Sequence, residues 1–139
     1  MTRRRLYLDT SAYLCVLLRE RRHEALGREL RGAELLSSAL LVLEARRNLT
    51  RHARQGALSA AQLQDALERV RSDVELFQLR DLTLDLCAES SMPPVSTPRS
   101  LDLAHLRTAL WFHAQAPIHR FVTLDADQAL AARELGLPS

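Results

Sequence analysis

The chain has 139 residues, a length that fits one compact domain with an apolar core and excludes two domains of ordinary size. Hydrophobic residues make up 47% and charged residues 26%, with four Gly and five Pro, so the composition excludes a disordered or collagen-like chain. The formal net charge of +2 does not by itself indicate a nucleic-acid binder, although all 19 basic residues are Arg, whose rigid fork of donors matches phosphate oxygens. We therefore expect one domain over residues 1–139.

Apolar runs and cysteines indicate the compartment. No apolar run exceeds about seven residues, and the first of them follows Asp9, so we expect neither a membrane span nor a signal peptide. Cys15 and Cys87 lie far apart in apolar runs, without the spacing of a metal or redox pair. We expect a cytoplasmic protein without a membrane segment, in which both cysteines are reduced core thiols.

Strand and helix patterns alternate along the chain. Helix starts are indicated by Ser38, by the capping-box pair Ser59 and Gln62, and by Ser100. Prolines make residues 91–98 a loop, and Gly136 ends the last helix. In chain order the patterns predict strands at residues 6–8, 34–37, 74–79 and 119–124, and helices at residues 12–18, 23–30, 40–54, 60–70, 81–89, 101–114 and 126–135.

Strands separated by helices predict an α/β fold with a mostly parallel sheet and helices on both faces. Ligands of such folds bind outside the carboxyl ends of the strands. Asp9 and Asp125 each follow a predicted strand at that end. The topology thus places two acids where a ligand is expected.

Four acids are candidates for chemistry: Asp9, Glu44, Asp102 and Asp125. The three aspartates fall at or near predicted helix starts, so each could simply cap a helix. Glu44 lies inside its helix on the apolar stripe, where capping cannot explain it. Its alternative role is a local pair with Arg47 or Asn48 on the next turn.

Gathered in one crevice, the four carboxylates would repel one another unless a cation neutralised them. Oxygen ligands without His or Cys suit Mg²⁺ or Mn²⁺, which act with phosphate substrates. With these four set aside, 13 acids remain against 19 arginines, a balance of about +6 that can attract a polyanion. Phosphodiester chemistry is therefore the favoured hypothesis.

The segments around these acids, in order, resemble the PIN-domain ribonucleases, in particular the VapC-type toxins of bacterial toxin–antitoxin pairs. They are Leu-Asp-Thr-Ser-Ala from residue 8, Ser-Ala-Leu-Leu-Val-Leu-Glu-Ala-Arg from 38, Leu-Asp-Leu-Ala-His-Leu-Arg-Thr-Ala-Leu from 101 and Val-Thr-Leu-Asp from 122. The resemblance spans nearly the whole chain. It implies a PIN-like three-layer sandwich whose mostly parallel central sheet has about four or five strands.

The resemblance also implies a function. Asp9, Glu44, Asp102 and Asp125 would form a catalytic pocket for Mg²⁺ or Mn²⁺, supported by the hydroxyls of Thr10, Ser11 and Thr123. The chain would be an endoribonuclease acting on RNA, a homodimer, and inhibited by a cognate antitoxin protein. Three features set it apart: Arg107 stands where relatives commonly have a small residue, Asp127 is an extra acid, and no strand is evident after the last helix.

Other readings remain open. Asp9 could be the nucleophile of a phosphohydrolase, although Ser11 stands where such enzymes carry a second acid, or the acids could only dock a partner protein. His105 lies one turn from Asp102 and could donate to it or to substrate, or be a packed core histidine. Arg46, Arg47, Arg51 and Arg54 are expected to be spread around their helix as solvated charges.

Overall fold

The computed structural model describes residues 3–88, 95–96 and 99–139, and its centre is a four-stranded sheet. All neighbouring strands pair in parallel, so the carboxyl ends of the strands meet at one edge. The predicted parallel α/β sheet of four or five strands is confirmed. The strands are β1 (Arg5–Leu8), β2 (Glu34–Ser38), β3 (Phe77–Arg80) and β4 (Arg120–Val122), in the order β3-β2-β1-β4.

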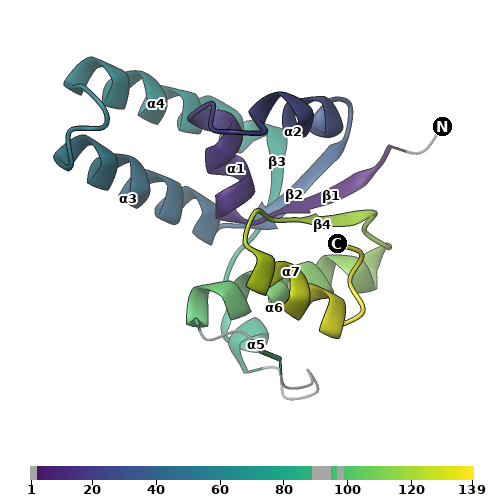
Figure 1. Ribbon diagram of the computed structural model, residues 1–139. Coiled ribbons are helices and arrows are strands. Elements are labelled where there is room, and N and C mark those ends of the chain that lie inside the picture. The colour runs from purple at the N-terminus through teal and green to yellow at the C-terminus, as the bar shows by residue number, and fades with distance from the viewer. Residues whose placement is uncertain (1–2, 89–94, 97–98) are drawn as a thin grey trace.

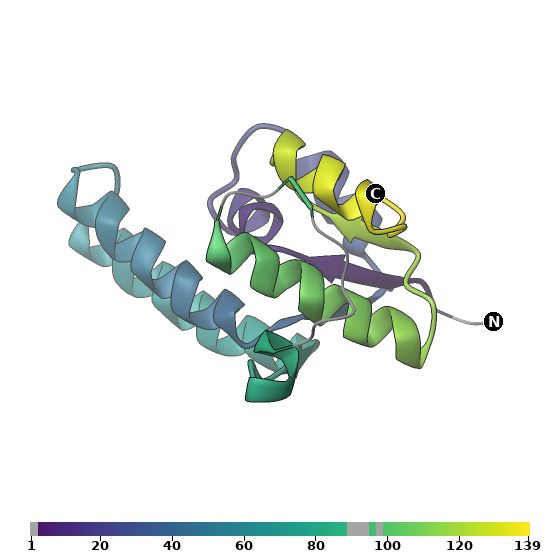
Figure 2. The same cartoon turned by 90° about the horizontal axis from the view of Figure 1, so that it is seen from below.

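Helices cover both faces of the sheet, as expected for a three-layer sandwich (Figure 1). The first two lie on one face and the last two on the other, and Figure 2 shows α6 lying across the sheet. No helix in the described ranges is long and apolar enough to cross a membrane. The helices are α1 (Thr10–Leu17), α2 (His23–Leu30), α3 (Leu40–Arg54), α4 (Ala60–Asp73), the 3-10 helix η1 (Val74–Leu76), α5 (Leu84–Cys87), α6 (Ser100–Gln115) and α7 (Ala126–Glu134).

Alternation along β1 builds a core on each side of the sheet. Tyr7 packs with Phe121 of β4, with Leu106 of α6 and with side chains of α7. Leu6 and Leu8 pack with α1 and α2 on the other face. The side chains of Leu6, Tyr7 and Leu8 are fully buried, which suits a central strand of a parallel sheet. Each such burial contributes about 1.5–3 kcal/mol, so β1 is firmly fixed beneath the residue that follows it.

A third core joins α3 to α4, which project side by side from the body of the molecule (Figure 1). Leu41, Ala45 and Leu49 of α3 are buried together with Val70 of α4. The predicted capping box is present, because Ser59 accepts from the amide of Gln62, whose side chain accepts from the amide of Ser59.

The structure differs from the sequence predictions in three elements. Residues 74–76 form η1 because the chain stays helical after α4, so the strand predicted over 74–79 begins only at Phe77. The helix predicted over 81–89 is the single turn α5, because Thr83 is still extended; residue 89 and most of the proline loop lie outside the described residues. Ser100 is the first residue of α6 rather than its cap.

The cysteine prediction is half right, because Cys15 is buried but Cys87 is exposed. Among the described residues no strand follows α7, in agreement with the sequence, but this segment covers the edge of the sheet. Gly136 takes a left-handed φ of 80°, and the amide of Phe121 donates to the carbonyl of Pro138 at 2.6 Å. The outer edge of β4 is therefore not left open.

Candidate active site

Parallel pairing brings Asp9 and Thr123 to the same edge of the sheet. Asp9 follows β1 directly and Thr123 follows β4, and Leu8 lies opposite Val122 in the pairing. The Thr123 hydroxyl donates to Asp9 Oδ2 at 2.5 Å. Asp125 stands two residues further along the same loop, so two of the predicted acids lie at the carboxyl ends of adjacent strands.

The Asp9 carboxylate is buried and held in one orientation. Its side chain is 5% exposed, and Oδ1 accepts from the Ser11 hydroxyl at 2.7 Å and from the Ala12 amide at 3.2 Å. The amide bond makes Asp9 the N-cap of α1, so the capping role is real. Burial raises the pKa of Asp9, although the hydroxyls of Thr123 and Ser11 oppose this shift.

Asp102 and Asp125 face each other from the starts of α6 and α7. Asp125 Oδ1 caps α7 by accepting from the amides of Asp127 and Gln128, and the Gln128 side chain donates to the backbone carbonyl of Asp102 at 2.8 Å. Within the described ranges no donor contacts the Asp102 carboxylate. Burial and then the charges of Asp125 and Asp9 raise the pKa of Asp102, although Arg99 and His105 oppose this shift. Three aspartates thus share one negative field.

Glu44 enters the same region from the first turns of α3. Its Oε1 accepts from the Thr10 hydroxyl and from His105 Nε2, each at 2.8 Å. Burial opposes its ionisation, but the bonds from His105 and Thr10 lower the pKa of Glu44 on balance. The alternative of a local pair with Asn48 is wrong for the carboxylate, because Asn48 donates to the backbone carbonyl of Glu44 instead.

Tyr7 is a member of this site that the sequence reading missed. Its hydroxyl lies 2.8 Å from His105 Nδ1, and His105 is 2% exposed. Because an ionised carboxylate only accepts, Nε2 of His105 donates to Glu44, and in the neutral ring Nδ1 accepts from the Tyr7 hydroxyl. Burial raises the pKa of Tyr7 well above its usual range, so it keeps its proton. The available signal was a strand tyrosine, whose buried hydroxyl needs a partner.

His105 bonds to Glu44. Its spacing on the helix had suggested Asp102 or the substrate as the acceptor. It is also a buried core residue, as the alternative reading had it. Arg107 does not reach the acids, because its Nη1 donates to the carbonyls of Leu86 and Cys87 and so ties α5 to α6. Asp127 is exposed, and its amide, not its carboxylate, takes part in the cap of α7.

The carboxylates of Asp9, Asp102 and Asp125 offer the kind of ligand atom that a hard cation prefers. Its ligand atoms are carboxylate oxygens, and both oxygens of Asp102 and Oδ2 of Asp125 are free of donors in the described part of the chain. As they stand, the described side chains form no group of three His, Cys, Asp or Glu close enough to hold an ion directly. The group fits a cation held partly through water, which is the usual manner of Mg²⁺.

The comparison with protein families gives a match to the PIN domain over residues 6–134, a range that includes all four acids. Comparison with curated proteins gives no match. PIN domains are generally nucleases and typically use divalent metal ions. Because the match covers most of the sequence, the chain belongs to the PIN domain family and has a function of the nuclease type.

Proposed function

We propose that the chain is an endoribonuclease that depends on Mg²⁺ or Mn²⁺ and hydrolyses RNA phosphodiester bonds. The observation that supports this most directly is the Asp102 carboxylate, which has no donor among the described residues and lies in the field of Asp9 and Asp125. Such mutual repulsion costs stability and is relieved by a divalent cation. All the ligand atoms are oxygens, which favours Mg²⁺ or Mn²⁺ over Zn²⁺.

In this proposal Asp9 and Asp102 would hold the cation directly, and Glu44 and Asp125 would act through water. A bound divalent cation supplies electrostatic stabilisation of the phosphoryl oxygens and an acidified water. Thr123 and Ser11 fix the Asp9 carboxylate, so little reorganisation is needed when the cation binds.

Glu44 differs from the three aspartates in its surroundings and in its proposed role. Its carboxylate is kept ionised by His105 and Thr10, so it is available to accept a proton from, or to orient, an attacking water. His105 is a positioning residue, since the Tyr7 hydroxyl fixes the ring whose Nε2 contacts Glu44. The same network argues against a nucleophilic Asp9, because Ser11 donates to Asp9 where a phosphohydrolase would need an acid.

The test is cleavage of a mixed RNA pool with Mg²⁺, with Mn²⁺ and with excess chelator. We expect cleavage only with a divalent cation, and a loss of at least about 100-fold in Asp9→Asn and Asp102→Asn. Asp127→Asn is the matched control, because Asp127 is an exposed aspartate of the neighbouring helix, and it should cleave like the wild type. Equal cleavage in chelator would refute metal dependence. Absence of Mn²⁺ binding by calorimetry would instead favour a non-catalytic module.

We further propose that the chain is the toxin of a VapBC-type pair, inhibited by a cognate antitoxin and active as a homodimer. The support is the order of its acidic segments, which resembles that of VapC-type toxins. A short neighbouring reading frame for a DNA-binding protein with a charged tail is expected. Co-expression of that protein should abolish RNA cleavage and form a stable complex, and sedimentation should give the mass of two chains. Unchanged cleavage in its presence would contradict the toxin role.

A further inference from the structure

An arginine-lined depression lies on the exposed face of α3. The expectation that these arginines are spread around the helix is wrong, because they share one face. The six residues that line the depression are Leu43, Arg46, Arg47, Thr50, Arg51 and Arg54.

Helix geometry accounts for this face. Each lining position stands three or four residues from another one, and positions with these spacings are neighbours on one side of a helix. Leu41, Ala45 and Leu49 point the opposite way and bury α3 against α4. The arginines are therefore fixed outward by the packing of the apolar residues behind them.

The positive charge of this face is not compensated. Among the described residues, none of its four arginines forms an ion pair with a carboxylate, and Arg51 donates only to the side chain of Asn48. Glu44 is the only acid of α3, and its carboxylate is turned to His105 and Thr10. A ligand for this face must bring negative charge.

The depression begins at the end of α3 that carries Glu44. Leu43, which is 66% exposed, precedes Glu44 in the chain, and Arg54 lies at the far end of the helix. At about 1.5 Å per residue the row extends roughly 16 Å from Leu43 towards the free end of the α3–α4 pair (Figure 1). A chain held at the acids can therefore continue along the arginines.

We propose that this face of α3 binds the phosphate backbone of the single-stranded RNA that the acids cleave, an inference that rests on the proposed function. RNA is favoured over an acidic peptide because the row continues from a site suited to a phosphodiester. A single helix offers one line of donors, which fits one strand. The lining includes no aromatic side chain for base stacking, so this contact reads charge rather than sequence.

The experiment measures binding of a fluorescent oligouridine by anisotropy in chelator, over a series of KCl concentrations. Each phosphate contact in a single strand contributes about 0.7 to the slope of log affinity against log salt. Arg51→Gln/Arg54→Gln should therefore lower the slope by about 1.4. Between 50 and 200 mM KCl, the wild type should lose about sevenfold more affinity than this variant.

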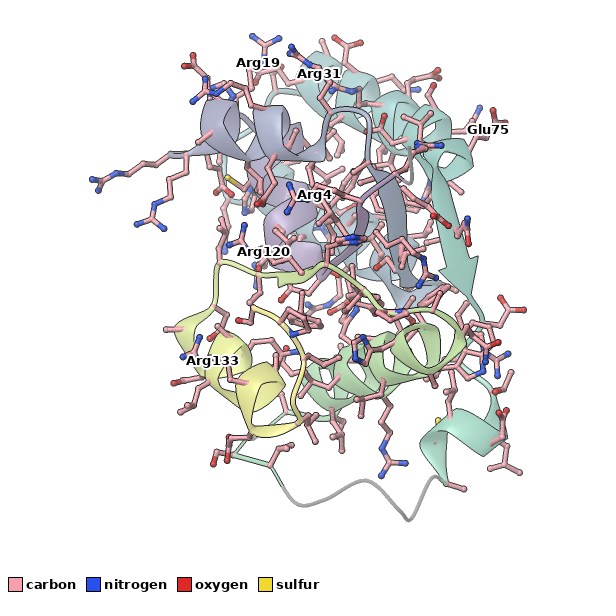
Figure 3. All side chains as sticks on the ribbon, turned by 90° about the vertical axis from the view of Figure 1, so that its right-hand side faces the viewer. Arg4, Arg19, Arg31, Glu75, Arg120 and Arg133 are labelled. Carbon is pink, nitrogen blue, oxygen red and sulfur yellow. The ribbon has the colours of Figure 1, made fainter. Side chains whose placement is uncertain are left out.

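The matched control removes the same charge elsewhere. Arg28→Gln/Arg31→Gln changes two exposed arginines at the end of α2, neither of which lines the depression on α3. Figure 3 shows Arg31 beside α2. The control should keep the slope of the wild type. Equal losses in both variants would mean that only net charge matters, and would overturn the assignment of the face.

Two further outcomes separate this inference from its rivals. An unchanged slope with metal-dependent cleavage intact would refute the α3 contact and leave the proposed nuclease standing. A lower slope in the variant without any cleavage by the wild type would support RNA binding by α3 and refute the proposed nuclease. If Arg51→Gln/Arg54→Gln leaves RNA binding unchanged but alters the sedimentation coefficient, the face contacts a second copy, and the RNA assignment is wrong.

Discussion

Replacing Tyr7 by Phe removes one hydroxyl from the network beneath Glu44. The hydroxyl lies 2.8 Å from Nδ1 of a histidine that is 2% exposed, so the change leaves a buried ring nitrogen without its hydrogen-bond partner. Such a loss costs about 1–3 kcal/mol. At about 3 °C per kcal/mol for a chain of this size, the melting temperature should fall by roughly 3–9 °C.

Function should be affected separately from stability. His105 loses one of the contacts that fix its ring, and Glu44 is held less firmly. If Glu44 orients the attacking water, kcat for RNA cleavage should fall while KM stays near its original value. The measurements are urea unfolding for stability and initial cleavage rates in saturating Mg²⁺, both below the unfolding temperature of the variant.

Tyr13→Phe is the matched control. The Tyr13 hydroxyl is also largely buried and donates to Asp73 Oδ2 at 2.9 Å, but it contacts none of the four acids. Its loss should lower stability by about 1–2 kcal/mol and leave kcat unchanged. The reasoning is refuted if Tyr7→Phe is as stable as the wild type, or if both variants lose the same fraction of kcat.

A double-mutant cycle isolates the pair. In a His105→Leu background the Tyr7 hydroxyl has already lost its acceptor, so the additional Tyr7→Phe change should cost about 1 kcal/mol less than it does in the wild type. Strict additivity of the two changes would show that the hydroxyl and the ring do not interact.

Two more predictions concern the aspartates. Burial and the charges of Asp125 and Asp9 raise the pKa of Asp102, so its ionised form destabilises the metal-free fold. Asp102→Asn should therefore be more stable than the wild type to urea at pH 7 without metal. The difference should shrink as the pH falls through the folded-state pKa towards the ordinary value of 3.8, and a less stable variant would contradict this sign. Asp125→Asn should keep the cap of α7 and its stability, whereas Asp125→Ala should lose about 0.5–2 kcal/mol; both should bind Mn²⁺ more weakly by calorimetry. Equal stability of the two variants would contradict the capping role.

The positions of Asp9 and Asp125 could be predicted because topology fixes them. Each follows a strand, and parallel strands present their carboxyl ends at one edge. Asp102 could not be placed in this way, because α6 follows a proline-rich loop whose path no local pattern determines. Its place beside Asp125 depends on the packing of α6 against α7, including the bond from Gln128. The sequence named Asp102 as a candidate acid at a helix start, but no local pattern identified its neighbours.

The sequence reading failed mainly to predict which side chains of different helices and strands contact one another. The side-chain spacing on α6 correctly turned His105 inward, but its acceptor comes from α3 and its donor from β1. Alternation along β1 predicts only that Tyr7 is buried. The arginine face of α3 is a different failure, because helical spacing alone places Arg47, Arg51 and Arg54 on one side, and the buried leucines confirm which side faces out.

The four acids differ in the hydrogen-bond donors that the protein supplies to their carboxylates. Asp9 and Glu44 receive hydroxyl or imidazole donors, and Asp125 receives two amides, whereas the Asp102 carboxylate receives none from the described residues. A charge kept in a repulsive field at a cost in stability is explained by function rather than by folding. In the proposed nuclease that cost is recovered when a cation binds. Added Mg²⁺ should then stabilise the wild type more than Asp102→Asn, as measured by the shift in melting temperature.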